Sequence, residues 1–394
     1  MRICLVSSEY PPETGWGGIG TYTYTIAHGL IKLGHEVHVI AYAPDKEIEY
    51  LDKEVRVYRI RQKKIKWAGR FEKSLLLSTL LYSIRVSGKI KELIDRYKLE
   101  IVEAPEWGSE AFWYSLNKTI PLIVRFHTPR FLIQELNSLP WTFRVRLLCL
   151  LEKIAALRAD LLTSPSRAMA EIIAKKYNIA KSKIKVIANP IDKDYFLPSG
   201  VENKLTVLFV GRLEYRKGAH ILAKAIPEVI KTFPDAKFIF IGNDSPSSPE
   251  KGSMMEYLLR IANGAKNLQF IGHTDRDKLL EYYRKSTICV FPSLWEAFGY
   301  TALEAMACGK PTIITDRFGI SEFLSRDALI QVKPQDHMAL AKAITDLLGN
   351  LEMRERLSKN SREAAVEYFS QESITNKYVE MLQQYIFAAA GNKK

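Results

Sequence analysis

The chain has 394 residues and a formal net charge of +13, from 57 lysine and arginine against 44 aspartate and glutamate residues. This length predicts two domains, and a hydrophobic fraction of 47% is ordinary for a globular protein. No apolar run reaches the ~18 residues of a membrane-spanning helix, and the first one is too short for a signal sequence. Four scattered cysteines (Cys4, Cys149, Cys289 and Cys308) lack disulfide or metal spacing. We therefore expect a cytoplasmic protein.

Positive charge is concentrated in one segment. Between Arg56 and Lys98 there are 13 lysine and arginine residues against 3 acidic ones, a local net charge of +10. Together with Trp67, Phe71 and an apolar helix, this charge suits peripheral contact of residues 56–91 with an anionic membrane. The alternative is a core-facing helix beside a solvated basic loop. Nucleic acid is not an expected partner, because no recognised binding motif accompanies the charge.

The first half alternates strands and helices, and a glycine-rich loop follows its first strand. This order predicts a doubly wound α/β domain. Strands are expected at 2–7, 35–42, 55–60, 101–103, 121–126, 160–164 and 183–188, and helices at 21–33, 71–97, 142–159 and 166–177.

The same rhythm restarts after a linker at residues 192–204. Strands are expected at 205–210, 237–241, 268–271, 288–291 and 311–315, and helices at 218–232, 254–262, 275–285, 335–348, 352–369 and 372–387, with a further short helix starting near Gly299. Two α/β halves predict two Rossmann-like domains. In open α/β sheets the ligand lies outside the carboxyl ends of the strands.

Residues 290–311 carry the clearest chemical pattern. A strand runs into a loop and then a helix, with Glu296 and Glu304 on either side of Gly299 and Thr301. A helix N-terminus offers unpaired N–H groups and a positive dipole end, so it binds anions. Two carboxylates around such a terminus suit a ligand with phosphates in its middle and hydroxyls at both ends. A sugar nucleotide is such a ligand.

The segment GRLEYRKG, residues 211–218, also follows a strand and opens a helix. Arg212 offers a fixed fork of donors for phosphate oxygens, and Lys217 offers a mobile point charge. The alternative is a solvated basic loop. Its place next to a predicted helix N-terminus favours the phosphate role.

Four motifs together resemble one family. They are EYPPETGWGGIG near the N-terminus, RFHT at 125–128, GRLEYRKG, and the glutamate pair at 296 and 304. In this order the chain resembles retaining glycosyltransferases of the family 4 type and, more distantly, bacterial glycogen synthases. The resemblance implies the α/β GT-B fold, two Rossmann-like doubly wound domains facing a central cleft. Residues 1–195, with a C-terminal helix at 372–394 packing back, would bind the acceptor, and residues 196–371 the donor.

The resemblance also implies roles for individual residues. The catalytic set would be His127, Glu296, Arg212 and Lys217. The donor-binding set would be Gly17, Gly18, Arg212, Lys217, His273, Glu296, Phe298, Gly299, Tyr300, Thr301 and Glu304. Strand ends of the first domain add candidate acceptor contacts at Glu9, Trp16, Glu103, Glu106 and Trp107, although these can equally be ordinary surface-loop residues.

We expect no metal or cofactor. Residues 192–194 and 275–277 fit a loose D-x-D pattern, but each has a cation in its middle and lies in a linker or at a helix start. The loop GWGGIG lacks the dinucleotide spacing GxGxxG, which argues against a nicotinamide. The family pattern is broken at Arg317-Phe318, where smaller residues are usual beside the donor sugar, and at Asn189-Pro190, where Asn-Gly is commoner.

The predicted function is transfer of a hexose from a UDP-, GDP- or ADP-sugar to a hydroxyl of a glycan or lipid-linked acceptor, with retention. No residue has the position of the general base that inversion requires, and in the family the leaving phosphate is described as taking the acceptor's proton. One alternative is an α-glucan synthase of the glycogen or starch type. Another, of a different class, is a non-catalytic sugar-nucleotide-binding protein.

Overall fold

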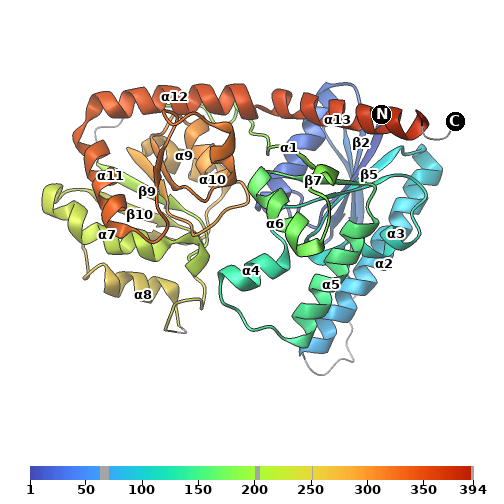
Figure 1. Ribbon diagram of the computed structural model, residues 1–394, viewed down its shortest axis with the longest axis horizontal. Helices are drawn as coiled ribbons and strands as arrows, with labels where there is room; N and C mark the ends of the chain where they lie inside the picture. Colours follow the sequence, from blue (N-terminus) through green and yellow to red (C-terminus); the bar gives the residue numbers. More distant parts are fainter. Residues whose placement is uncertain (63–70, 200–204, 251, 392–394) are drawn as a thin grey trace. The chain divides into compact units, whose positions relative to one another are not determined.

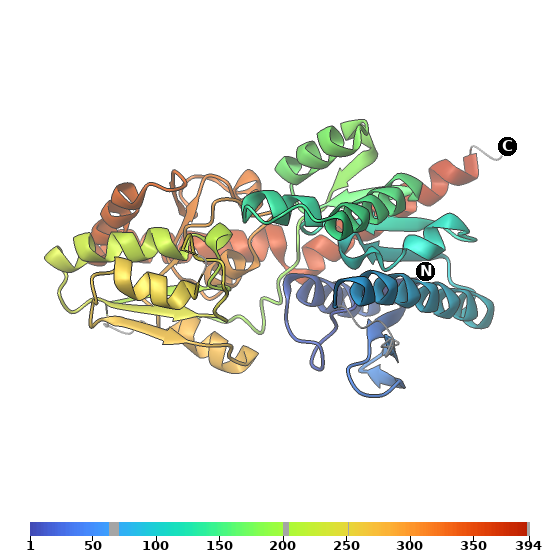
Figure 2. The ribbon, with the colours of Figure 1, turned by 90° about the horizontal axis from the view of Figure 1, so that it is seen from below.

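The computed structural model describes residues 1–62, 71–199, 205–250 and 252–391. The chain divides into two compact units, Met1–Pro190 with Gln371–Lys394, and Ile191–Ser370 (Figures 1 and 2). Each unit is a sheet covered on both faces by helices. The prediction of two doubly wound α/β domains is confirmed.

The described residues of the first unit form an eight-stranded sheet in the order β3-β4-β2-β1-β5-β6-β7-β8. All neighbours are parallel except β3 and β4, which form an antiparallel hairpin at the edge. The strands are β1 (Arg2–Val6), β2 (Glu36–Tyr42), β3 (Ile48–Asp52), β4 (Val55–Ile60), β5 (Ile101–Pro105), β6 (Leu122–Arg125), β7 (Leu161–Ser164) and β8 (Ile184–Val186).

Helices cover both faces of this sheet, because its crossovers run in opposite directions on the two sides of β1. The connection that contains α1 leads toward β2, whereas those that contain α2 and α5 lead the other way (Figure 1). The helical elements are α1 (Gly18–Lys32), α2 (Phe71–Tyr97), η1 (Trp107–Ser109), α3 (Phe112–Leu116), α4 (Arg130–Leu136), α5 (Phe143–Arg158), α6 (Arg167–Tyr177), η2 (Lys181–Lys183) and α13 (Gln371–Gly391).

Helix α13 belongs to the first unit because it packs on α1. The Gln371 side-chain Nε2 donates to the Thr25 carbonyl at 2.8 Å, and Lys32 Nζ donates to Gln371 Oε1 at 2.6 Å. A Cβ at Gly29 would lie 2.2 Å from the Thr375 hydroxyl oxygen, so glycine permits the close approach of the two helices. The last segment therefore completes the first unit's helical layer.

The described residues of the second unit form a six-stranded, wholly parallel sheet in the order β11-β10-β9-β12-β13-β14. Its strands are β9 (Thr206–Val210), β10 (Lys237–Ile241), β11 (Leu268–Ile271), β12 (Ile288–Phe291), β13 (Thr312–Thr315) and β14 (Ile330–Val332). Its helical elements are η3 (Tyr215–Lys217), α7 (Ala219–Thr232), α8 (Met254–Ile261), α9 (Arg276–Lys285), α10 (Tyr300–Ala307), η4 (Gly319–Phe323), α11 (His337–Gly349) and α12 (Leu351–Phe369).

The central strands of the second sheet are buried along their whole length. Strands β9 (TVLFV) and β12 (ICVF) have every residue buried, as expected where helices cover both faces of a parallel sheet. Apolar side chains of α7, α8 and α11 pack with β9, β10 and β12 into one core cluster. This core fixes the carboxyl ends of β9 and β12 next to each other.

Some elements differ from those expected. Strand β3 was missed because it is an edge strand whose residues are mostly exposed, and β14 because it has only three residues. The helix expected from Thr21 begins at Gly18, where two glycines obscured the start, and the strand expected at 183–188 is only Ile184–Val186. The helix expected at 71–97 is confirmed. Residues 63–70, which hold much of the basic segment, and 200–204 of the linker lie outside the described residues.

We predict that Gly218→Ala destabilises the second unit by about 2 kcal/mol or more, because Gly218 has a φ of +71° and a Cβ there would lie 1.9 Å from the Pro292 carbonyl oxygen. Gly264→Ala is the matched control. Its φ of +65° is similar but nothing lies within 4 Å, so about 1 kcal/mol is expected. Urea unfolding measures both variants, and equal losses would contradict the close approach.

Candidate functional site: the carboxyl edge of the second sheet

Two loops meet at the point where the strand order of the second sheet reverses. From β9 the chain moves to β10 on one side, and β12 pairs with β9 on the other. The loops that follow β9 and β12 therefore leave the sheet side by side, which is where open α/β sheets bind ligands. Their backbones touch at Gly218 and Pro292, and the Leu294 amide donates to the Arg216 carbonyl at 2.8 Å.

Glu296 is the centre of a buried charge cluster between these loops. Its Oε1 accepts from Lys217 Nζ at 2.5 Å, from the Ser293 hydroxyl at 3.1 Å and from Arg216 Nη1 at 3.3 Å. Arg216 also donates to Glu214 at 2.7 Å. Two cations and two carboxylates thus balance each other, with Glu296 only 8% exposed and Arg216 5% exposed.

The two cations keep Glu296 ionised. Burial raises the pKa of a carboxyl, but the attraction of Lys217 and Arg216 outweighs burial and brings the pKa of Glu296 below its ordinary value. Removing one member of such a buried set is strongly destabilising, because it leaves an uncompensated charge. The cluster therefore presents a fixed carboxylate and a fixed ammonium at the sheet edge.

Backbone hydrogen bonds fix the Glu296 loop from its other side. The Glu296 amide donates to the Arg317 carbonyl at 3.0 Å, and the Gly319 amide donates to the Glu296 carbonyl at 3.1 Å. The buried Phe318 ring lies against Gly299, where a Cβ would be 2.5 Å from a ring carbon. Phe318, one of the two residues that break the family pattern, thus packs under the loop, while Arg317 is exposed beside Asp316.

Helix α10 begins directly after this loop. Gly299 is its N-cap, with a φ of +107° that favours glycine, and the amides of Tyr300 and Thr301 lie in its first turn. Phe298, predicted to bind the donor, is buried in an aromatic cluster with Phe323 and Phe369. Its contacts in this structure are those of a core residue that supports the helix start.

Glu304, in the same helix, is hydrogen-bonded to another side chain of the second unit. The Tyr283 hydroxyl donates to its Oε2 at 2.9 Å. Burial raises the pKa of Glu304 to about 7, against the lowering effect of Tyr283 and of Arg276. Burial therefore outweighs the compensation that these two side chains give the carboxylate.

The remaining predicted donor residues of this unit lie on its surface. The Arg212 side chain is 64% exposed and lies 3.8 Å from Glu214, and His273 is exposed after β11. The buried arginine of the cluster is Arg216, which the sequence prediction missed. Two arginines in one short loop could not be ranked by spacing, because which of them points inward depends on the turn at η3.

In the first unit, the glycine-rich loop is closed by Glu9. Its carboxylate lies over Gly17, with an oxygen 2.2 Å from where a Cβ would be, and accepts from the Gly20 amide at 3.3 Å. Gly17 is the N-cap and Gly18 the first residue of α1. The Trp16 ring packs edge-on against Tyr24 at 4.9 Å. A carboxylate of the protein thus lies at the α1 N-terminus, beside Gly17 and Gly18, which were predicted to contact the donor.

The other candidates of the first unit lie in β5 or after β5 and β6, and they are largely engaged within the protein. Both Glu106 oxygens accept from the His127 amide at 2.9 Å, and Tyr22 donates to Glu103 at 2.9 Å. The Trp107 ring carries the Arg130 guanidinium 4.3 Å above it. Burial and Arg125 lower the pKa of His127 well below its usual value, so its imidazole is neutral at pH 7.

Aspartates of the two D-x-D segments accept hydrogen bonds from nearby backbone amides. Asp275 caps α9 by accepting from the Lys278 amide at 2.8 Å, which confirms the predicted helix start. Asp192 accepts from the amides of Asp194 and Tyr195 at 3.1 Å. Over the described ranges, no group of three or more His, Cys, Asp or Glu side chains has the arrangement of a metal site. Among the same residues, no helix has the length and hydropathy to span a membrane.

Comparisons with known proteins identify the family of this chain. The family described as Glycosyl transferases group 1 matches residues 194–364, and Glycosyltransferase Family 4 matches residues 16–195. The glycogen synthase of Mycobacterium tuberculosis is 25% identical over 100% of this chain and 96% of its own length. The chain belongs to the GT4-type glycosyltransferases.

Solved structures define the fold as GT-B. Sucrose-phosphate synthase from Thermosynechococcus elongatus superposes with a TM-score of 0.78 at 22% identity, over 98% of this chain and 99% of that one. HepE of Anabaena, in complex with UDP and glucose, superposes with a TM-score of 0.72 at 18% identity, over 97% and 99% of the two chains. The predicted GT-B fold class is confirmed.

We predict that Glu304→Gln raises the melting temperature at pH 8 but not at pH 5. A carboxyl whose folded pKa is raised to about 7 contributes stability below its unfolded pKa and loses it as the pH rises through 7, whereas glutamine does not ionise. The difference at pH 8 should reach at least about 3 °C. Glu367→Gln, an exposed position on α12, is the control. If Glu304→Gln and wild type have the same melting temperature at both pH values, the raised pKa of Glu304 is contradicted.

Proposed function

We propose that the protein transfers a hexose from a nucleoside-diphosphate sugar to a hydroxyl acceptor, glycan or lipid-linked, with retention. The observation that carries the proposal is the contact of Lys217 with Glu296 at the carboxyl edge of the second sheet. An ammonium for phosphate oxygens and a carboxylate for sugar hydroxyls lie side by side there, next to the α10 N-terminus. HepE, which has the same fold, was solved with UDP and glucose.

The roles follow from charge. Lys217 and the first-turn amides of α10 stabilise the negative charge that grows on the departing diphosphate. Arg212, exposed and able to move, adds donors to the same phosphates. Glu296 accepts from donor-sugar hydroxyls, and Glu304 from the ribose. Arg216 donates to Glu296 and fixes the position of its carboxylate, so we regard Arg216 as a positioning residue.

We propose retention of the anomeric configuration because the phosphate of the departing nucleoside diphosphate serves as the base that takes the acceptor's proton. The bond from the anomeric carbon to the diphosphate breaks, and the acceptor oxygen bonds to the same face of that carbon. The acceptor's proton passes to the departing phosphate oxygen. We assign to His127, whose imidazole is neutral at pH 7, the role of donating a hydrogen bond to the sugar without adding charge. No metal or cofactor is assigned to this chemistry.

An α-glucan synthase is the second candidate, because a glycogen synthase matches the whole chain. The two candidates differ in their acceptor. Retarded migration in native gels that contain glycogen would favour the glucan synthase, whereas unchanged migration and transfer to a small acceptor would favour the first proposal.

We predict that Lys217→Ala lowers turnover at least about 100-fold, the loss typical of removing one transition-state donor. Glu296→Gln should also lower turnover, because it removes the charge that Lys217 and the sugar hydroxyls contact. Turnover is measured as nucleoside diphosphate release from UDP-, GDP- and ADP-sugars. Lys224→Ala removes an exposed lysine of α7 and is the control. Circular dichroism checks that each variant is folded. A folded Lys217→Ala variant with wild-type turnover would overturn the site.

We predict that the product has the anomeric configuration of the donor. Proton NMR of the first turnovers from an α-linked donor should show an α-glycoside, because attack and departure share one face of the sugar. A β-glycoside would require a protein base and would contradict the mechanism proposed here.

A further inference from the structure

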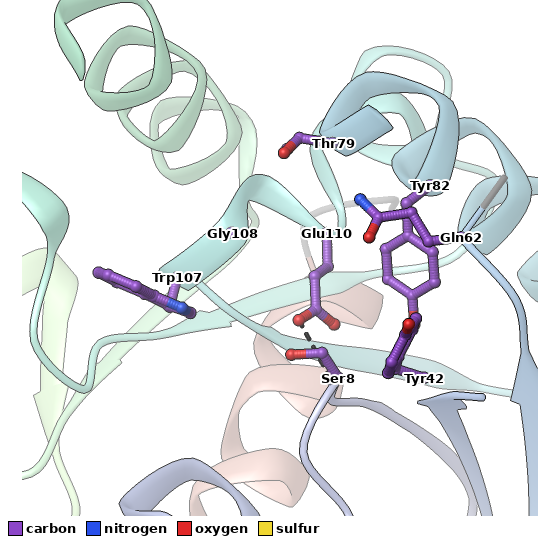
Figure 3. A pocket seen from close by; sticks show the side chains of 8 residues that line it. All are labelled: Ser8, Tyr42, Gln62, Thr79, Tyr82, Trp107, Gly108 and Glu110. Carbon is purple, nitrogen blue, oxygen red and sulfur yellow. Dashed lines mark hydrogen bonds between the residues drawn. The ribbon is translucent and has the colours of Figure 1, made fainter. Parts of the chain in front are cut away.

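The first unit contains a pocket at the reversal point of its own strand order. It lies between the loops that follow β1 and β5, the neighbours at which the first sheet's crossovers change direction. Its volume is about 230 Å³, and it is lined by Ser8, Tyr42, Gln62, Thr79, Tyr82, Trp107, Gly108 and Glu110 (Figure 3). The switch-point rule that places the donor in the second sheet therefore predicts a ligand here as well.

Two polar side chains in this pocket are buried without a complete set of partners. Glu110 is 2% exposed; its Oε1 accepts from the Ser8 amide at 3.0 Å, whereas its Oε2 has no hydrogen-bond partner among the described residues. The Tyr82 hydroxyl, in a side chain 6% exposed, also has none within the described part of the chain. Figure 3 shows the carboxylate and the phenol lining the same space.

Such groups are unusual, because burying a polar atom without a hydrogen bond is costly. Burial raises the pKa of Glu110 to about 7 despite its hydrogen bonds to Ser8, so the protein compensates the charge only in part. A ligand that supplies a donor to Glu110 and an acceptor to Tyr82 would satisfy both atoms. A hydroxyl group can do both.

Among the described residues, the charge around the pocket disfavours an anion. None of the described lining residues carries a positive charge. Arg59 and Arg85 lie near Tyr82, but Arg59 is paired with Glu13 and donates to the Tyr10 carbonyl at 2.8 Å, and Arg85 is paired with Glu47 at 2.6 Å. A phosphate in the pocket would face the Glu110 carboxylate, and the two described arginines near Tyr82 are already paired with carboxylates.

The size of the pocket limits the ligand to about one ring. Its volume of about 230 Å³ lies below the roughly 300 Å³ at which pockets for drug-sized ligands begin. Tyr42 and Tyr82, whose rings meet edge-on at 6.2 Å, form one apolar wall.

We propose that this pocket binds an uncharged, hydroxyl-bearing ring of the acceptor, with Glu110 and Tyr82 as its specificity-determining residues. This inference rests on the proposed function, whose acceptor it narrows to a neutral sugar or cyclitol unit and away from a phosphate monoester. Of the acceptor candidates predicted from sequence, Trp107 lines the pocket, and its ring is turned away from Glu110 (Figure 3).

The test is saturation-transfer NMR with the full-length protein. The probes are glucose, mannose and myo-inositol, each compared with its monophosphate. At least one neutral ring should bind, and its phosphate at least about tenfold more weakly. Glu110→Gln keeps an acceptor for the Ser8 amide but should weaken neutral-ring binding about tenfold, the value of a hydrogen bond to a charged group. It should also reduce the discrimination against the phosphate.

Controls separate binding from folding. Glu100→Gln removes the same charge at the opposite end of β5, where Glu100 pairs with Arg2, and should leave binding unchanged. Tyr82→Phe should weaken binding three- to tenfold without lowering the melting temperature of the unliganded protein, because the hydroxyl has no hydrogen-bond partner among the described residues. A lowered melting temperature would indicate a structural role and overturn this part of the proposal.

The outcomes also separate this inference from the proposed function. Neutral rings that bind in a Glu110-dependent manner to a protein without nucleotide-sugar turnover would uphold the pocket and overturn the function. Turnover that depends on Lys217, with phosphates bound as tightly as neutral rings or with Glu110→Gln equal to wild type, would overturn the pocket alone. Absence of binding by all three neutral rings would overturn it too.

Discussion

The second unit depends on one buried interaction, the ion pair of Glu296 with Lys217 and Arg216. It joins the loop after β9 to the loop after β12, and both loops approach closely only because Gly218 lies against the Pro292 carbonyl. Charges buried at this depth are stable only when they are paired. The pair therefore fixes the backbone of both loops and holds in place the ammonium and the carboxylate that we propose bind the sugar nucleotide.

The two sheets share one topological feature, the reversal of strand order, but carry different side chains at that point. In each unit, loops leave adjacent strands at the point where the strand order reverses, and polar side chains gather there. The second sheet places cations and a helix N-terminus at this edge, which suits phosphates. The first sheet places Glu110 and Tyr82 there, which suits hydroxyl groups. This division of charge is the basis on which we propose a different substrate for each unit.

Sequence reasoning found what depends on local pattern and missed what depends on packing. The doubly wound fold followed from strand and helix periodicity, and Glu296 and Lys217 from motifs that flank buried strands. Arg216 was missed in favour of Arg212, because only the turn at η3 decides which arginine is buried. Glu110 and Tyr82 were missed because they lie 28 residues apart on different elements and share no motif. Phe318 broke a family pattern whose spatial meaning, packing against Gly299, required coordinates.

The central claim is that the Lys217–Glu296 cluster binds a nucleoside diphosphate. Calorimetric titration with UDP, GDP and ADP, without sugar or acceptor, tests it most directly. The account predicts that at least one of the three binds and that Lys217→Ala weakens this binding at least about tenfold, the loss of a charge-assisted hydrogen bond. Absence of binding by all three, or equal affinity of wild type and a folded Lys217→Ala variant, would contradict it.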